Sequence, residues 1–82
     1  MVTVKILGSG CANCRRLEAM VQKVVTAKRL DVRLEEVTDY AEIMKYPILS
    51  TPGLVIDEKL VSAGRIPAES EIVQWLSAAG AV

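Results

Sequence analysis

The sequence predicts a small α/β fold in which strands and helices follow the order βαβαββα. Three observations support this prediction. Short β-branched runs are bounded by glycine or proline, one long segment has helical apolar spacing, and 51% of the 82 residues are hydrophobic. A chain of this length can bury the core of one domain, so residues 1–82 are expected to form a single domain.

The first half of the chain is predicted to form a strand, a helix and a second strand. Residues 2–7 are β-branched and apolar and predict a strand that ends at Gly8. Residues 31–37 alternate with period two, as a half-buried strand does. Between these strands, from residue 13 to about 28, apolar residues recur at the spacing of one helical face. They are Leu17, Met20, Val21, Val24 and Val25. A helix between two strands favours parallel pairing with a right-handed crossover.

The middle of the chain is predicted to contain a short helix. Asp39 followed by Glu42 resembles a capping box, and the helix should end near Lys45, ahead of Pro47. Met44 of this helix, like Met20, is interpreted as a residue that fills the core.

The last part of the chain is predicted to form a hairpin and a helix. Residues 54–56 and 59–63 predict two antiparallel strands joined by the tight turn Asp57–Glu58. The final helix is expected over residues 68–79, after a proline and before a glycine.

Charge and hydropathy exclude some classes of partner. Ten basic and ten acidic residues cancel and form no basic run, so nucleic acid is not an expected partner. No apolar run approaches the roughly 20 residues that cross a bilayer, so no membrane contact is expected. The start of the chain lacks the layout of a secretion signal, and a cytoplasmic location is expected.

The pair Cys11-Ala12-Asn13-Cys14 follows a glycine-rich turn and opens the first helix. Free N–H groups in a first helical turn stabilise a thiolate, and Arg15 and Arg16 add positive charge. Cys11 is expected to be exposed and nucleophilic, and Cys14, one turn further, to be more buried and close enough for a disulfide. The alternative is a pair of cysteines packed in the core. Two cysteines without histidine cannot supply the four ligands of a structural zinc site.

Two segments resemble the thioredoxin/glutaredoxin superfamily in its smallest form, the group of small redox-active disulfide proteins. They are VKILGSGCANC at residues 4–14 and YPILSTPGLVID at residues 46–57. The resemblance covers essentially the whole chain. It implies a minimal thioredoxin fold, with a four-stranded mixed sheet of order 4-3-1-2, an antiparallel third strand and flanking helices. It also implies a cis-proline at Pro52 that faces the cysteine pair.

The resemblance implies a thiol–disulfide oxidoreductase that reduces or exchanges disulfides on partner proteins, with Cys11 and Cys14 as catalytic residues. No bound cofactor is expected, and a separate reductase would restore the dithiol. Thr51 and Pro52 would dock the backbone of the substrate as an added strand. Gly10, Ala12 and Asn13 would shape the exposed rim of the site.

The sequence also departs from the family pattern, and alternatives stay open. Lys5 stands where thioredoxins have a buried acid, so proton transfer at Cys14 would need another group or water. Lys5 itself is interpreted as a strand residue whose amine reaches solvent, with a charge near the site as the alternative. A glutathione-dependent, glutaredoxin-like reductase is one alternative. The other is a Cu(I) carrier that uses the same two thiolates. Such carriers follow the order βαββαβ and end in a strand, whereas this chain is predicted to end in a helix.

Overall fold

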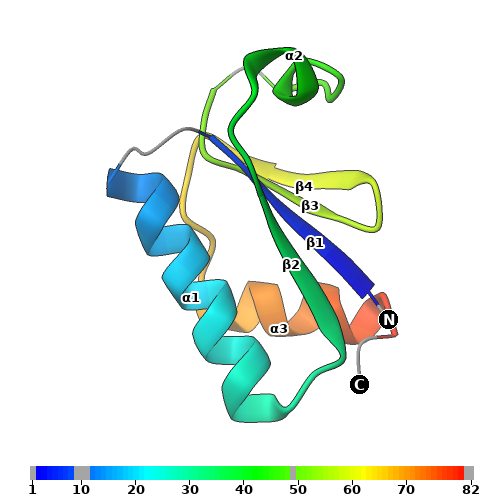
Figure 1. The fold of residues 1–82 in the computed structure, drawn as a ribbon. Coiled ribbons are helices and arrows are strands. Elements are labelled where there is room, and N and C mark those ends of the chain that lie inside the picture. The colour runs from blue at the N-terminus through cyan, green and yellow to red at the C-terminus, as the bar shows by residue number, and fades with distance from the viewer. Residues whose placement is uncertain (1, 9–11, 49, 81–82) are drawn as a thin grey trace.

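The computed structural model describes residues 2–8, 12–48 and 50–80 of the chain. Its seven elements follow the predicted order, and the fold class is confirmed (Figure 1). The strands are β1 (Val2–Leu7), β2 (Val32–Val37), β3 (Gly53–Ile56) and β4 (Lys59–Ala63). The helices are α1 (Ala12–Lys28), α2 (Tyr40–Ile43) and α3 (Glu69–Ala78).

The four strands form one mixed sheet in the order β2-β1-β3-β4. β1 is parallel to β2, with Val2 opposite Val32 and Leu7 opposite Val37. β3 runs antiparallel to both β1 and β4. The strand order and the antiparallel third strand are therefore as the family resemblance implies. Because β1 lies inside the sheet, the turn that follows it emerges between two neighbouring strands.

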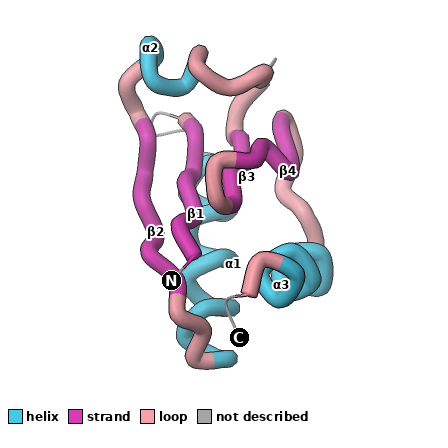
Figure 2. The backbone as a smooth tube through the Cα atoms, turned by 90° about the vertical axis from the view of Figure 1, so that its right-hand side faces the viewer, coloured by secondary structure: helices cyan, strands magenta, loops and turns pink. Residues whose placement is uncertain are grey.

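Helices α1 and α3 cover one face of the sheet (Figures 1 and 2). Alternate residues of a strand point to opposite faces, and the first, third and fifth residues of β1 point to this side. They join the apolar stripe predicted for α1 and the inner side of α3 in one buried cluster. Its members are Val2, Val4, Ile6, Leu17, Val21, Val24, Leu54, Ile56, Ile72 and Leu76. This cluster fixes α1, and with it the helix start that carries Cys14.

The other face of the sheet has a smaller apolar cover. Leu7, Ile43, Ile48 and Val55 form a second buried cluster, against which Tyr46 packs partly. Helix α2 lies beyond the ends of β1 and β2 rather than along the strands (Figures 1 and 2). Much of this face is therefore left to polar side chains.

Two details of the predicted short helix are wrong. α2 ends at Ile43, because the N–H of Lys45 bonds to Glu42 O and tightens the chain into a turn. Met44 is 52% exposed and does not fill the core. The cap at Asp39 is present, since its carboxylate accepts the N–H of Ala41 at 3.0 Å. Glu42, expected to complete a capping box, ion-pairs with Lys45 at 2.9 Å.

Helix α3 begins one residue later than predicted, after Ala68. The carboxylate of Glu71 accepts the Ala68 N–H at 3.2 Å and binds the Arg65 guanidinium through both oxygens. This contact ties the loop after β4 to the start of the helix. None of the helices in the described residues is long and apolar enough to cross a membrane.

Candidate active site

Cys14 lies in the first turn of α1 and is 2% exposed. Its predicted burial is confirmed, and it is disulfide-bonded. Ala12 and Asn13, in the same turn, are exposed. Cys11 and Gly10 lie outside the described residues.

Gly8, directly after β1, is the point where separate parts of the site meet. Its φ is +154°, and its N–H donates to Val37 O at 3.0 Å. A Cβ built on Gly8 would collide with the Sγ of Cys14 and lie 3.6 Å from the Cβ of Thr51. The cysteine of α1 and the loop before β3, far apart in the sequence, therefore pack against one glycine.

The Thr51–Pro52 peptide bond is cis, as the resemblance implies. Thr51 is exposed while the ring of Pro52 is buried. Pro52 O accepts the N–H of Gly64 at 2.9 Å. On the other side, Gly53 packs so closely under Ile48 that an added Cβ would meet the Ile48 Cδ1 atom. The loop thus presents an exposed residue beside Cys14 on a base that is held from both sides.

Positive charge surrounds the start of α1. Arg15 and Arg16 are both exposed there, and neither forms an ion pair within the part of the chain that the structure describes. The free N–H groups of a first helical turn add a partial positive charge. Both features favour the thiolate form of a reduced cysteine at this position.

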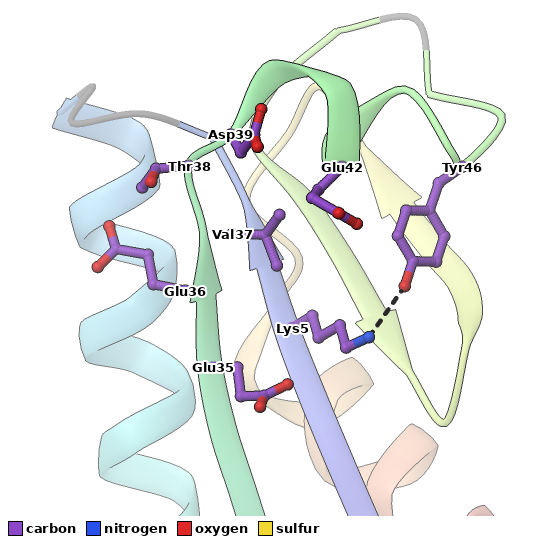
Figure 3. Close-up of a pocket in the computed structure, with 8 residues that line it drawn as sticks. All are labelled: Lys5, Glu35, Glu36, Val37, Thr38, Asp39, Glu42 and Tyr46. Atoms are coloured by element: carbon purple, nitrogen blue, oxygen red, sulfur yellow. Dashed lines mark hydrogen bonds between the residues drawn. The ribbon is translucent and has the colours of Figure 1, made fainter.

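Lys5 does not simply reach solvent, as the sequence suggested. Its side chain is 23% exposed, and its Nζ lies 2.7 Å from Glu58 Oε1 and donates to the Tyr46 hydroxyl at 3.2 Å (Figure 3). The Tyr46 hydroxyl in turn donates to Glu58 Oε2 at 3.0 Å. Figure 3 shows Lys5 and Tyr46 pointing toward each other across the sheet face.

This network keeps Lys5 charged and away from the cysteine chemistry. The hydrogen bonds that Lys5 donates to Glu58 and then to Tyr46 raise the pKa of Lys5, and the hydrogen bonds that Glu58 accepts from Lys5 and Tyr46 lower the pKa of Glu58. Lys5 alternates in β1 with Val4 and Ile6, which face α1, so its side chain lies on the opposite face. An ammonium held in this way cannot accept a proton from Cys14.

A cleft of about 550 Å³ opens beside Lys5 on the same face (Figure 3). Half of the residues that line it are acidic. The lining residues are Lys5, Glu35, Glu36, Val37, Thr38, Asp39, Glu42 and Tyr46. Within the ranges that the structure describes, no group of three or more histidine, cysteine or acidic residues could hold a metal ion. Cys11 and Cys14 are the candidate ligands for a soft metal in the reduced protein.

Fold and site define a class of protein: a small α/β domain with a buried cysteine at a helix start, facing a cis-proline loop. Comparison with known proteins gives the family. A model of the thioredoxin domain matches residues 2–77. The chain belongs to this thioredoxin family, a family of thiol–disulfide oxidoreductases.

Two archaeal thioredoxins are similar to the chain over most of its length. The thioredoxin of Methanothermobacter thermautotrophicus is 32% identical over 77 residues, which cover 94% of this chain and 100% of that protein. The thioredoxin of Methanocaldococcus jannaschii is 36% identical over 76 residues, which cover 93% of this chain and 87% of that protein.

A solved structure agrees with the fold. The germline-specific thioredoxin Deadhead of Drosophila melanogaster has a TM-score of 0.67 at 13% identity. The match covers 94% of this chain and 79% of that one. At this identity the likeness concerns the fold alone.

Reasoning from the sequence missed two parts of this region. Gly8 was interpreted only as a residue that ends a strand, although a glycine shortly before a cysteine pair could have signalled close packing. The contacts among Lys5, Tyr46 and Glu58 had no sequence signal, because the three residues are far apart in the chain and no periodicity connects them.

Proposed function

We propose that this chain is a two-cysteine thiol–disulfide oxidoreductase that reduces or exchanges disulfides on partner proteins. The observation that carries the proposal is the meeting of Cys14 and Thr51 at Gly8. A buried cysteine in the first turn of a helix, beside an exposed loop residue, suits a resolving cysteine close to a docked substrate. Membership of the thioredoxin family supports the same reaction class.

The proposed reaction has two exchange steps. The thiolate of Cys11 attacks one sulfur of the substrate disulfide, forms a mixed disulfide and releases the other substrate sulfur as a thiolate. Cys14, after losing its proton, attacks the Sγ of Cys11. The bond between Cys11 and the substrate breaks, and the second substrate sulfur leaves as a thiolate. Two electrons pass from the Cys11–Cys14 dithiol to the substrate, and the released thiolates take up protons from solvent.

The proposed roles of the other site residues are based on their exposure and on their position relative to the cysteine pair. Thr51 and Pro52 dock the substrate backbone as an added strand, since Thr51 is exposed and stands beside Cys14. Gly10, Ala12 and Asn13 form the rim around the reacting sulfurs. The chemistry needs no bound cofactor. It does need a separate reductase and a reducing compartment such as the cytoplasm, where the dithiol form is restored.

The proposal is tested by trapping the mixed disulfide. Cys14→Ser should accumulate a covalent adduct with a disulfide substrate, because Cys11 attacks and nothing resolves the product. Cys11→Ser should form no adduct and turn over no substrate. Both results are read by mass spectrometry under non-reducing conditions. Turnover by Cys11→Ser equal to that of the unaltered chain would contradict the assignment of the nucleophile.

An experiment on the unaltered protein distinguishes the proposed function from the Cu(I)-carrier alternative. The described elements end with α3 rather than with a strand, which differs from the βαββαβ order expected of such carriers. Reduced protein mixed with Cu(I) should bind the metal weakly while it turns over a disulfide substrate rapidly. Tight stoichiometric Cu(I) binding without disulfide turnover would favour the carrier.

A further inference from the structure

The segment between α2 and β3, residues 44–52, carries the docking residues Thr51 and Pro52. Three contacts along its path can be followed in the structure. Tyr46 bonds to Lys5 and Glu58, Ile48 packs over Gly53 and Leu7, and Pro52 O accepts the N–H of Gly64. The last two contacts lie at the start of β3. The first one anchors the segment at its start.

This first contact joins three separate elements through one phenol. Lys5 belongs to β1, Tyr46 to the segment itself, and Glu58 to the turn between β3 and β4. The Tyr46 hydroxyl accepts from Lys5 Nζ at 3.2 Å and donates to Glu58 Oε2 at 3.0 Å. Lys5 Nζ also lies 5.9 Å from the centre of the Tyr46 ring, within the range of a cation–π contact.

The ring of Tyr46 packs partly against the cluster of Leu7, Ile43, Ile48 and Val55. The apolar side of Tyr46 therefore anchors the segment to the sheet, and its hydroxyl fixes the direction of the ring. Lys5 and Glu58 hold the hydroxyl from two sides, one as a donor and the other as an acceptor. Because the Tyr46 side chain is held in one orientation, the direction of the backbone that follows it toward Ile48 and Thr51 is restricted.

We infer that Lys5, Tyr46 and Glu58 are positioning residues that preorganise the docking segment for protein disulfides. The inference rests on the proposed function and extends it to substrate specificity. The three residues lie away from Cys14, because Lys5, to which Tyr46 and Glu58 are bonded, lies on the sheet face opposite α1. A preordered segment binds an extended partner with less loss of conformational freedom. The network therefore favours macromolecular substrates, whereas a small disulfide that does not use the segment gains nothing from it.

The test compares two substrates in the reduced, unaltered chain and in Tyr46→Phe, which removes only the hydroxyl. The substrates are a protein disulfide, such as insulin, and a small aromatic disulfide, 5,5′-dithiobis(2-nitrobenzoate). Loss of a hydrogen bond worth roughly 1 kcal/mol corresponds to an increase of about fivefold in KM for the protein disulfide. The increase should fall on KM rather than on kcat. The ratio of the protein-disulfide rate to the small-disulfide rate should fall by the same factor.

Three further variants give the controls: Lys5→Met alone, Lys5→Met with Tyr46→Phe, and Lys23→Met. Lys5→Met combined with Tyr46→Phe should raise KM by less than the product of the single effects, because both changes remove the same bond. Lys23→Met is the matched control. It also removes a lysine paired with a glutamate, but this pair joins α1 and α3 on the other side of the sheet, with 3.9 Å between Lys23 Nζ and Glu69 Oε2. It should leave both rates within about twofold, as expected for an exposed ion pair.

Several outcomes would overturn the inference. An unchanged KM in Tyr46→Phe, or an equal rise in Lys23→Met, removes the positioning role. A parallel fall in kcat and in the small-disulfide rate would mean that the network acts on the cysteines instead.

If the unaltered chain turns over no disulfide at all, the proposed function fails, and amide exchange still decides the positioning. The Gly64 amide, bonded to Pro52 O, should then exchange faster in Tyr46→Phe, while the Ile72 amide of α3 keeps its rate. Equal exchange of Gly64 in both proteins would contradict the inference.

Discussion

The two faces of the sheet hold their helices and loops by different means. On the α1 and α3 side, fully buried aliphatic side chains from β1, β3 and both helices interlock. On the α2 side, a smaller apolar cluster is extended by hydrogen bonds among Lys5, Tyr46 and Glu58. The first face supports the start of α1, where Cys14 lies, through buried packing. The second orients the loop that lies beside Cys14, and it does so with contacts that pH and single polar substitutions can alter.

The largest effect is expected on the α1 side. Leu17→Ala removes a fully buried side chain between α1 and the sheet. We expect a loss of about 3 to 4 kcal/mol in the free energy of unfolding. Urea denaturation followed by circular dichroism measures it. A loss below about 1 kcal/mol would show that this face is not the tightly packed one.

Gly8 tests whether this close packing extends to the end of β1. Gly8→Ala places a methyl group against Cys14 Sγ at a positive φ, and we expect a destabilisation of about 2 to 3 kcal/mol. Gly80→Ala is the matched control. Gly80 also has a positive φ, +86°, but apart from its chain neighbours no atom of the described residues lies within 4 Å of an added Cβ. It should cost about 1 kcal/mol from backbone strain alone. Equal effects in thermal unfolding would mean that the contact at Cys14 is unimportant.

A smaller effect is expected for the apolar cluster of the second face. Ile48→Val removes one methylene group over Gly53 and should cost about 1 kcal/mol. Because Ile48 precedes the docking residues, the change should also speed amide exchange at Gly64 more than at Ile72. An equal increase in the exchange rates of the Gly64 and Ile72 amides would indicate that the loop and the α3 side open together.

The smallest effect concerns pH. The pKa of Glu58 is lowered by its hydrogen bonds from Lys5 and Tyr46. A carboxylate with a lowered folded pKa stabilises the fold above its unfolded pKa, and this contribution disappears as pH falls through the folded value. Between about pH 5 and pH 3, the melting temperature of the unaltered chain should fall more than that of Glu58→Gln. Parallel curves would contradict a role for Glu58 in the stability of this face.

The same contrast explains how much could be predicted from the sequence. On the α1 side, the buried residues of the helix recur at the helical period. Spacing alone therefore predicts Leu17, Val21 and Val24 as core residues. The strand at residues 59–63 and the cap at Asp39 were likewise found from local signals. These features depend on neighbours along the chain, which a sequence displays directly.

The second face depends on residues that are distant in sequence. Lys5 was interpreted as reaching solvent because nothing near it in the chain indicates Tyr46 or Glu58. Met44 was assigned to the core from its residue type, but the turn at Lys45 leaves it exposed. The cysteine pair was recognised from its position before a helix. Its packing against Gly8 and Thr51 needed the tertiary structure.

The central place of β1 has a consequence for synthesis on the ribosome. β1 is made first, yet its two neighbours in the sheet are completed only after residues 37 and 56 have emerged. A nascent chain therefore contains both thiols long before Thr51 and Pro52 exist to face them. The candidate site is assembled late, by the arrival of β3, and an unfinished polypeptide carries both cysteines without the loop that packs beside Cys14 in the finished fold.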